Sequence, residues 1–123
     1  MTSAKIRAVR GATTCSVDTP EEIAAATQEL LTLLMARNEL DHDDVVSVIL
    51  TTTPDLTSSF PATAARAVGF GDIPLLCASE IAVPGSMPRC VRVLLHVYTE
   101  SARTDIHHVY LRDARSLRDD LPE

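Results

Sequence analysis

Charged side chains within or beside apolar segments are the residues of this sequence best suited to chemistry. Arg92 stands inside the apolar run 90–95, Arg10 ends an alternating segment near the start of the chain, and Glu80 follows a short apolar segment. A charge in an apolar strand needs a partner, because burial without one is costly. Spacing alone leaves two interpretations open. The three residues form a structural ion-pair network, or they line a pocket for a small dianion, to which Tyr110 adds a hydroxyl.

General catalytic motifs are absent from the sequence. It has no nucleophile elbow, no His-x-x-x-His pair and no phosphate-binding loop. The three cysteines lack Cys-x-x-Cys spacing, and we expect Cys77 and Cys90 to fill core positions rather than act as nucleophiles. The net charge of −6 argues against nucleic acid as the main partner, because phosphate binding requires a basic face. We therefore predict neither a nucleic-acid site nor a metal site.

The composition is that of a small globular protein, and we expect residues 1–123 to form a single domain. Hydrophobic residues make up 46% of the chain and aromatic residues 3%, so the core must be aliphatic. The first residues contain no apolar run typical of a signal peptide, and Arg92 interrupts the longest apolar segment, so no membrane span is predicted. An odd number of unpaired cysteines favours the reducing cytoplasm. Domains this small often gain stability by association.

Hydrophobic periodicity and turn signals predict five strands and two helices. Thr19, Pro20 and Glu22 form a strong helix start, and that helix should end near Asn38. The second helix is expected over residues 60–68, capped by Thr57 or Ser58 and closed by Gly69. We expect the strands at residues 5–13, 45–51, 75–79, 90–98 and 107–111, followed by a charged tail.

This order of elements predicts an α+β fold, with a mixed sheet and helices packed on one face. In the first strand, Ile6, Ala8 and Arg10 share one face, and Arg7 and Val9 share the other. The face without helices needs a cover, and another protomer is the simplest candidate.

Five blocks of the sequence, in order and without large gaps, resemble the small trimeric α/β class of chorismate mutases. Residues 6–14 resemble the opening of the family, which carries Arg-Gly-Ala close after its start. Residues 53–62 are similar to its T-x-D-L-x-x-x-F-P-A signature, and residues 74–80 match its third-strand block. Residues 91–94 and 108–111 complete the pattern, with Leu117 and Arg118 in the tail. The resemblance spans essentially the whole chain.

The resemblance implies an isomerase that converts chorismate to prephenate in aromatic amino-acid biosynthesis, without cofactor or metal. It also implies a homotrimer that forms a pseudo-α/β barrel, with an active site at each subunit interface. By position, Arg92 is expected to face the ether oxygen of chorismate, Glu80 to hold its ring hydroxyl, and Arg10 to bind a carboxylate. The remaining substrate-binding positions are Tyr110 at a carboxylate, Cys77 with its neighbour Leu76 beside the ring, Leu117 and Arg118 in a tail over the pocket, and Phe60, Ala62, Thr63 and Arg66 from the neighbouring protomer.

The chemistry suits these residues, because the rearrangement is concerted and no proton is transferred. The protein must hold a compact conformer of the substrate and stabilise negative charge on the ether oxygen, a task for Arg92. Thr63 is uncharged where relatives often carry a charge, so we expect it to act through its backbone N–H. Two alternatives are kept: a non-catalytic trimeric module that binds an aromatic-pathway metabolite, and an imine-deaminase-like enzyme with a water activated near Glu80.

Overall fold

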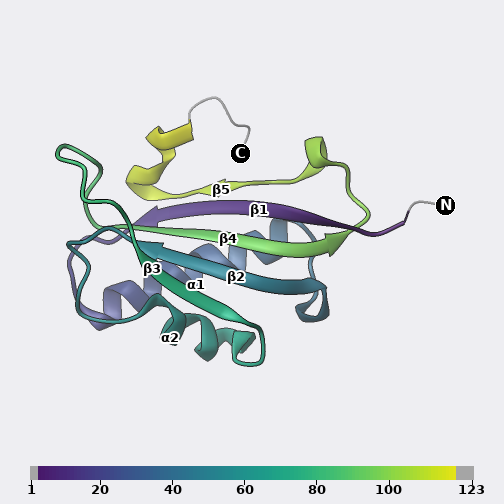
Figure 1. The fold of residues 1–123 in the computed structure, drawn as a ribbon, viewed down its shortest axis with the longest axis horizontal. Helices are drawn as coiled ribbons and strands as arrows, with labels where there is room; N and C mark the ends of the chain where they lie inside the picture. Colours follow the sequence, from purple (N-terminus) through teal and green to yellow (C-terminus); the bar gives the residue numbers. More distant parts are fainter. Residues whose placement is uncertain (1–2, 119–123) are drawn as a thin grey trace.

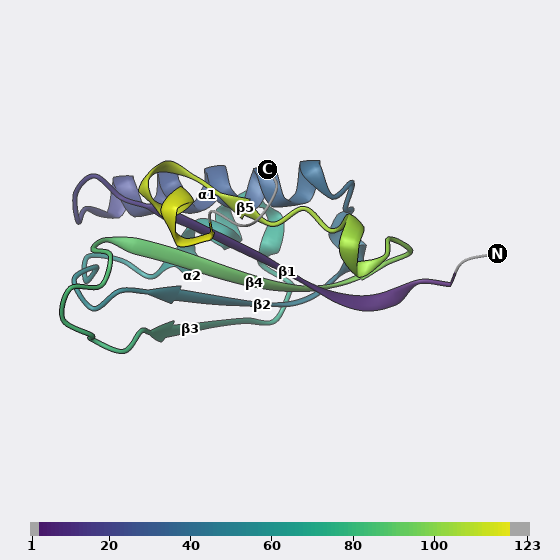
Figure 2. The same cartoon turned by 90° about the horizontal axis from the view of Figure 1, so that it is seen from above.

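A five-stranded mixed sheet with both α-helices on one face forms the fold (Figures 1 and 2). This computed structural model describes residues 3–118. The strands lie in the order β3-β2-β4-β1-β5, with β4 antiparallel to both β1 and β2. Their bounds are Lys5–Thr14 for β1, Val45–Thr52 for β2, Leu75–Ser79 for β3, Cys90–Thr99 for β4 and Val109–Tyr110 for β5. The predicted α+β class is confirmed.

Helix α1, Pro20–Arg37, begins and ends where the sequence predicts. The Thr19 hydroxyl accepts a hydrogen bond from the backbone N–H of Glu22 at 3.2 Å, and Asn38 is the carboxyl-terminal cap. The Glu22 carboxylate does not return to the cap, however. It accepts hydrogen bonds from the backbone N–H and the hydroxyl of Ser16 in the preceding loop. One face of α1 is fully buried against the sheet, including Leu30, Leu31 and Leu34.

Gly11 allows α1 to pack closely against β1. A Cβ at this position would lie 2.9 Å from Leu34 Cδ1 and 3.0 Å from Leu30 Cδ1, closer than side chains tolerate. The glycine of the Arg-Gly-Ala block therefore has a packing role. Its neighbours Arg10 and Ala12 point to the opposite face of the strand.

The second helix is shorter than predicted. Helix α2 spans Pro61–Ala65, and a single π-helical turn, Arg66–Phe70, follows it. Gly69 lies inside this turn and breaks the helical path with φ of 102°, which agrees with its predicted role in closing the helix. The predicted cap is wrong: Phe60 precedes the helix without a capping side chain, and Thr57 and Ser58 instead donate to the Asp18 carboxylate.

The last strand is also shorter than predicted, and Asn38 explains why. Its side-chain amide donates to the His107 carbonyl at 2.8 Å and accepts from the His107 N–H at 2.8 Å. Both backbone groups of His107 are thereby occupied, so pairing with β1 begins at Val109. The predicted charged tail forms a 3₁₀ helix over Arg112–Arg118, and shorter 3₁₀ turns span His42–Asp44 and Arg103–Asp105.

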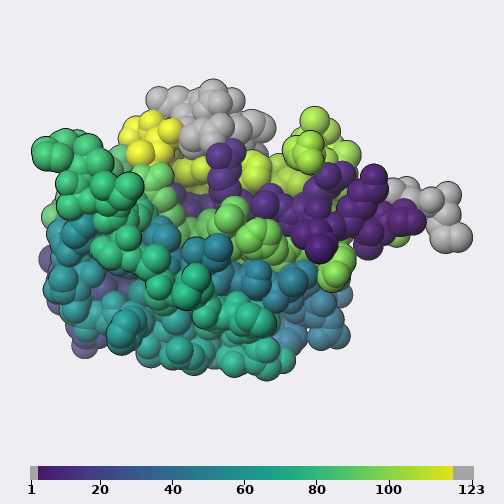
Figure 3. Space-filling view, in the orientation of Figure 1, coloured from purple at the N-terminus to yellow at the C-terminus, as the bar shows by residue number. Residues whose placement is uncertain are grey.

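The face of the sheet opposite the two α-helices remains largely open (Figures 2 and 3). Ile6, Leu76 and Tyr98 are exposed to 54%, 62% and 48%. Within residues 3–118, the 3₁₀ helix Arg112–Arg118 covers part of this face. Its Ala114 is fully buried in a cluster with Ala12 and Cys90, against which Met87 also packs. Within residues 3–118, no helix has the length and apolar character needed to cross a membrane.

Candidate active site

Side chains from four strands meet on the open face of the sheet. Arg92 lies on the central strand β4, with Ala12 of β1 and Thr51 of β2 as its neighbours in register. Ala12 is paired in turn with Tyr110 of β5. Because paired residues point to the same face, Arg92, Thr51 and Tyr110 face the same space. The short side chain of Ala12 leaves room between Arg92 and Tyr110.

Arg92 is held by an acid that the sequence places 12 positions before it. Its Nε lies 3.2 Å from Glu80 Oε2, and the Thr51 hydroxyl donates to the same oxygen at 2.6 Å. Glu80 is positioned by its own N–H, which donates to the Thr52 carbonyl at 2.9 Å. The Arg92 side chain is 47% exposed and that of Glu80 is 19% exposed. Arg92 thus lies on the central strand β4 rather than on an edge strand, and its side chain remains partly exposed to solvent in the single chain.

A cavity of about 400 Å³ lies beside this ion pair. Arg10, Arg92, Tyr110 and Leu117, all predicted from the sequence, line it together with apolar side chains of β2 and β4. Within residues 3–118, Arg10 has no carboxylate partner, so its charge is available to a ligand. Such a cavity, with two guanidiniums over an apolar floor, suits a small anion with a hydrocarbon ring.

Further positive charge lies next to the cavity. A second hollow of about 320 Å³ shares Arg10 and Leu94 with it and is also lined by Arg7, Arg103 and His108. The His108 Nδ1 accepts a hydrogen bond from the Arg10 backbone N–H at 3.0 Å, which fixes the ring beside β1. The guanidiniums of Arg7, Arg10 and Arg103 attract an anion electrostatically, although the whole chain carries a net charge of −6.

Cys77 and Phe60 lie in a different place. They line a separate hollow of about 490 Å³ at the end of β3, which shares no lining residue with the first cavity. Cys77 is paired with Leu50, a core residue, and packs against the core. Within one chain, Cys77 therefore does not line the cavity beside Arg92, contrary to the expectation. Cys77 lies with Phe60, a residue that is 71% exposed.

The remaining predicted positions are spread over α2, β3 and the tail. Ala62 is buried, whereas Thr63 and Arg66 are exposed on the α2 segment. The Thr63 N–H donates to the Phe60 carbonyl at 3.1 Å, so the expectation that this N–H is available to substrate is not supported. Leu76 lies on the open face, in register with Ile49 of the cavity. Arg118 ends the 3₁₀ helix, and its side chain lies outside the described part of the chain.

Thr51 is a site residue that the sequence analysis missed. Alternation along β2 places it on the same face as Ile49, but its position beside Glu80 and Arg92 depends on the register of β2 with β3 and β4. That register cannot be read from one strand alone. A hydroxyl-bearing residue at the end of an apolar strand was the available signal.

Neither Cys15 nor Cys90 is an activated thiol, and the described residues hold no metal cluster. Burial raises the pKa of the Cys15 thiol to about 11, with the nearby Glu22 charge adding to the effect. Burial also raises the pKa of Cys90. Both thiols therefore stay protonated near neutral pH and are poor nucleophiles. Among residues 3–118, no three His, Cys, Asp or Glu side chains are grouped as a metal ion would require.

Comparison with known proteins gives consistent matches over nearly the whole chain. The profile of the family described as chorismate mutase type I matches residues 6–121. The chorismate mutase AroH of Thermus thermophilus is 48% identical over 117 residues, which cover 94% of this chain and 96% of that protein. For the chorismate mutase AroH of Bacillus subtilis the identity is 42%, with coverage of 94% and 92%. A solved chorismate mutase from Clostridium thermocellum superimposes with a TM-score of 0.88 at 48% identity, covering 89% of this chain and 98% of that one.

Proposed function

The chain belongs to the chorismate mutase type I family and is a chorismate mutase, and we propose that the cavity beside Arg92 and Glu80 is where it rearranges chorismate to prephenate. The observation that supports this placement most directly is the pair of arginines, Arg10 and Arg92, over an apolar floor. Chorismate is a dianion with a hydrophobic ring, and this cavity offers a matching surface.

Each residue in the proposal has a separate task. The guanidinium of Arg10 binds a substrate carboxylate, and the Tyr110 hydroxyl lies on the same wall. Arg92 stabilises the negative charge that grows on the ether oxygen as the C–O bond breaks and the C–C bond forms. Glu80, whose Oε2 lies 3.2 Å from the Arg92 Nε, fixes the direction of the guanidinium and accepts a hydrogen bond from the ring hydroxyl of the substrate. Leu117 excludes water from the reacting conformer.

We also propose that three chains form a trimer, in which the hollow around Phe60 and Cys77 completes the cavity of the neighbouring protomer. The large exposed fractions of Phe60 and Ile81, 71% and 85%, support this arrangement, because such side chains are usually covered. The open face of the sheet supports it as well. A cytoplasmic location is proposed too, supported by the three free cysteines.

Two measurements test the function and the assembly. Loss of chorismate, followed by its ultraviolet absorbance with the purified chain, should show turnover without added metal or cofactor. Absence of turnover would favour a non-catalytic binding module. Light scattering should give three times the chain mass of 13.3 kDa. A monomer with full activity would rule out the shared site.

The shared site has a sharper test in mixed assemblies. Arg92→Ala alters the cavity beside Glu80, and Phe60→Asp alters the separate hollow around Cys77. If both hollows contribute to each site, each variant alone should be inactive. If the proposal is correct, refolding the two variants together regenerates some unaltered sites at protomer boundaries and restores part of the activity. Mixing either variant with itself serves as the control. A mixture with no restored activity would contradict the division of the site between protomers.

A further inference from the structure

Arg112 joins the two segments that form one wall of the cavity. Tyr110 lies two residues before it at the end of β5, and Leu117 lies five residues after it in the 3₁₀ helix Arg112–Arg118. The backbone of Arg112 adopts φ of 53°, the left-handed region that a residue with a Cβ enters only at a cost. A residue held in this region is stabilised by the contacts around it, and for Arg112 these include contacts of its side chain.

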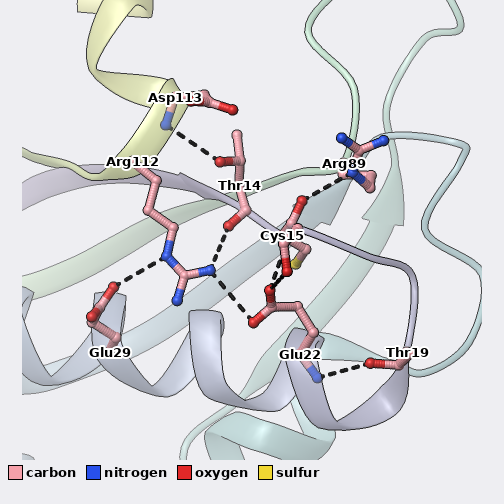
Figure 4. A network of polar contacts seen from close by, with 9 residues as sticks. Thr14, Cys15, Thr19, Glu22, Glu29, Arg89, Arg112 and Asp113 are labelled. Atoms are coloured by element: carbon pink, nitrogen blue, oxygen red, sulfur yellow. Dashed lines mark hydrogen bonds and ion pairs between the residues drawn. The ribbon is translucent and has the colours of Figure 1, made fainter.

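The guanidinium of Arg112 makes three contacts with residues of β1 and α1. Its Nη1 donates to the Thr14 carbonyl at 2.9 Å and lies 3.5 Å from Glu22 Oε1, while its Nε lies 3.6 Å from Glu29 Oε1. Figure 4 shows the side chain reaching from the 3₁₀ helix to α1, between the two carboxylates. The contacts therefore join the carboxyl-terminal segment to the end of β1 and to the start and middle of α1.

The partner on α1 is itself held in place. The Glu22 side chain is 18% exposed, and its carboxylate accepts from the Ser16 N–H at 2.8 Å and from the Ser16 hydroxyl. These bonds, with Arg112 as a further cause, lower the pKa of Glu22, so the carboxylate is charged at neutral pH. Glu29 lies about two turns further along the same buried helix. Arg112 is thus attached to a rigid element rather than to a mobile side chain.

On the basis of the function proposed above, we propose that Arg112 is a positioning residue that fixes the cavity wall carrying Tyr110 and Leu117. Besides the burial of Ala114 against Ala12 and Cys90, two backbone N–H groups attach this segment to β1. The Leu111 N–H donates to the Ala12 carbonyl at 2.9 Å, and the Asp113 N–H makes a long contact of 3.4 Å with the Thr14 hydroxyl. Removing the guanidinium leaves the left-handed residue without its side-chain contacts, and the helix that carries Leu117 moves away from the cavity.

Arg112→Asn is the test variant, because asparagine tolerates the left-handed conformation while lacking the guanidinium. We expect KM for chorismate to rise about tenfold and kcat to change by less than about twofold, since the wall contributes to substrate capture and touches no breaking bond. Arg115→Asn is the matched control: it lies in the same 3₁₀ helix, is exposed, and has no ion pair within residues 3–118. Its KM should equal that of the wild type.

A second measurement does not depend on the reaction. Hydrogen exchange of the backbone amides of residues 112–117 should accelerate in Arg112→Asn and not in Arg115→Asn, whereas the amides of α1 should keep their protection. Unchanged exchange with unchanged KM would overturn the proposal. Accelerated exchange in a chain without mutase activity would support the positioning role while rejecting the proposed function.

Glu29→Gln provides a second route if Arg112→Asn does not fold. Glu29 is on the surface of α1, with a side chain 49% exposed, so its replacement leaves the core intact. We expect a smaller rise in KM, about two- to threefold, with kcat unchanged. A fall in kcat at constant KM in either variant would contradict a positioning role, because it would place the network at the reacting atoms.

Discussion

The Nε of Arg92 and the Oε2 of Glu80 lie 3.2 Å apart on the open face of the sheet, in the middle of the candidate active site. The same carboxylate oxygen accepts a hydrogen bond from the Thr51 hydroxyl at 2.6 Å. Arg92 comes from β4, Thr51 from β2 and Glu80 from the residue after β3, so three strands converge on one oxygen. This arrangement orients the guanidinium before any substrate arrives, and electrostatic catalysis depends on such preorganisation.

Glu80→Gln should therefore lower kcat more than it raises KM. The amide keeps the shape of the side chain but loses the charge that orients Arg92, and we expect kcat to fall by about 10- to 100-fold. Thr51→Val, which removes the hydroxyl and keeps the volume, should lower kcat by about two- to fivefold. Steady-state kinetics on both variants provide the test. A rise in KM at wild-type kcat would assign Glu80 to substrate binding alone.

Local patterns predicted the elements of this fold well, and the errors have identifiable causes. The strands at 45–51 and 75–79 were placed to within one residue, because short apolar runs and the nearby Pro54 and Pro74 mark them clearly. The strand at 107–111 was predicted too long, because the Asn38 amide, distant in sequence, occupies the backbone of His107. The cap of α2 was wrong for a similar reason. Thr57 and Ser58 bind Asp18, which a local reading cannot anticipate.

The candidate site depended on tertiary information to a greater extent. Alternation groups Arg10 with Ile6 and Ala8 on one face of the first strand, but it takes strand order and register to bring Arg10 and Arg92 to one cavity. The position of Glu80 beside Arg92 requires β2 to lie between β3 and β4. For Cys77, the period of two along β3 turns the side chain toward the core, away from that cavity. The resemblance to a family supplied the roles of these residues, and spacing alone left them open.

We predict a flat pH profile for kcat from mildly acidic to mildly alkaline pH, because no proton moves in a concerted rearrangement. The rate should also be the same in heavy water as in ordinary water. Both measurements use the wild-type chain with saturating chorismate. A bell-shaped profile together with a solvent isotope effect would indicate general acid–base catalysis by Glu80, as in the imine-deaminase-like alternative.

Cys15 gives a prediction for alkaline stability. Burial raises the pKa of its thiol from 9.0 to about 11, so the unfolded chain loses this proton at lower pH than the folded chain does. The contribution of Cys15 to the free energy of unfolding is therefore complete below pH 9 and is lost as the pH rises through about 11. The free energies of unfolding of the wild type and of Cys15→Ser, measured with denaturant, should therefore change relative to each other across this pH range, by at most about 1.4 kcal/mol per pH unit. A constant difference would contradict the raised pKa. Activity at neutral pH should be nearly unchanged in this variant.

The tail should contribute to substrate capture rather than to chemistry. Deletion of the residues after Asp113 would also remove Ala114, which is fully buried against Ala12 and Cys90, so Leu117→Ala is the cleaner change. We expect KM to rise by about three- to tenfold and kcat to fall less, because Leu117 lines the cavity but carries no charge. Arg115→Asn again serves as the control. A collapse of kcat at constant KM would place the tail in the catalytic group.

Arg92 carries the last and most stringent prediction. In the isolated chain its side chain is 47% exposed, and in the proposed assembly substrate and a neighbouring protomer cover the cavity and desolvate the guanidinium. A cation under such a cover acts mainly on charge that appears in the transition state. Removal of one preorganised donor typically lowers kcat by about 10²–10³, so Arg92→Ala should nearly abolish turnover while the trimer still forms. Arg92→Lys retains the charge but loses the planar fork whose Nε meets Glu80 at 3.2 Å. We expect a steep fall in kcat and a much smaller change in KM, because transition-state stabilisation is lost. If Arg92→Lys raised KM at wild-type kcat, Arg92 would be a binding residue and the proposed mechanism would be wrong.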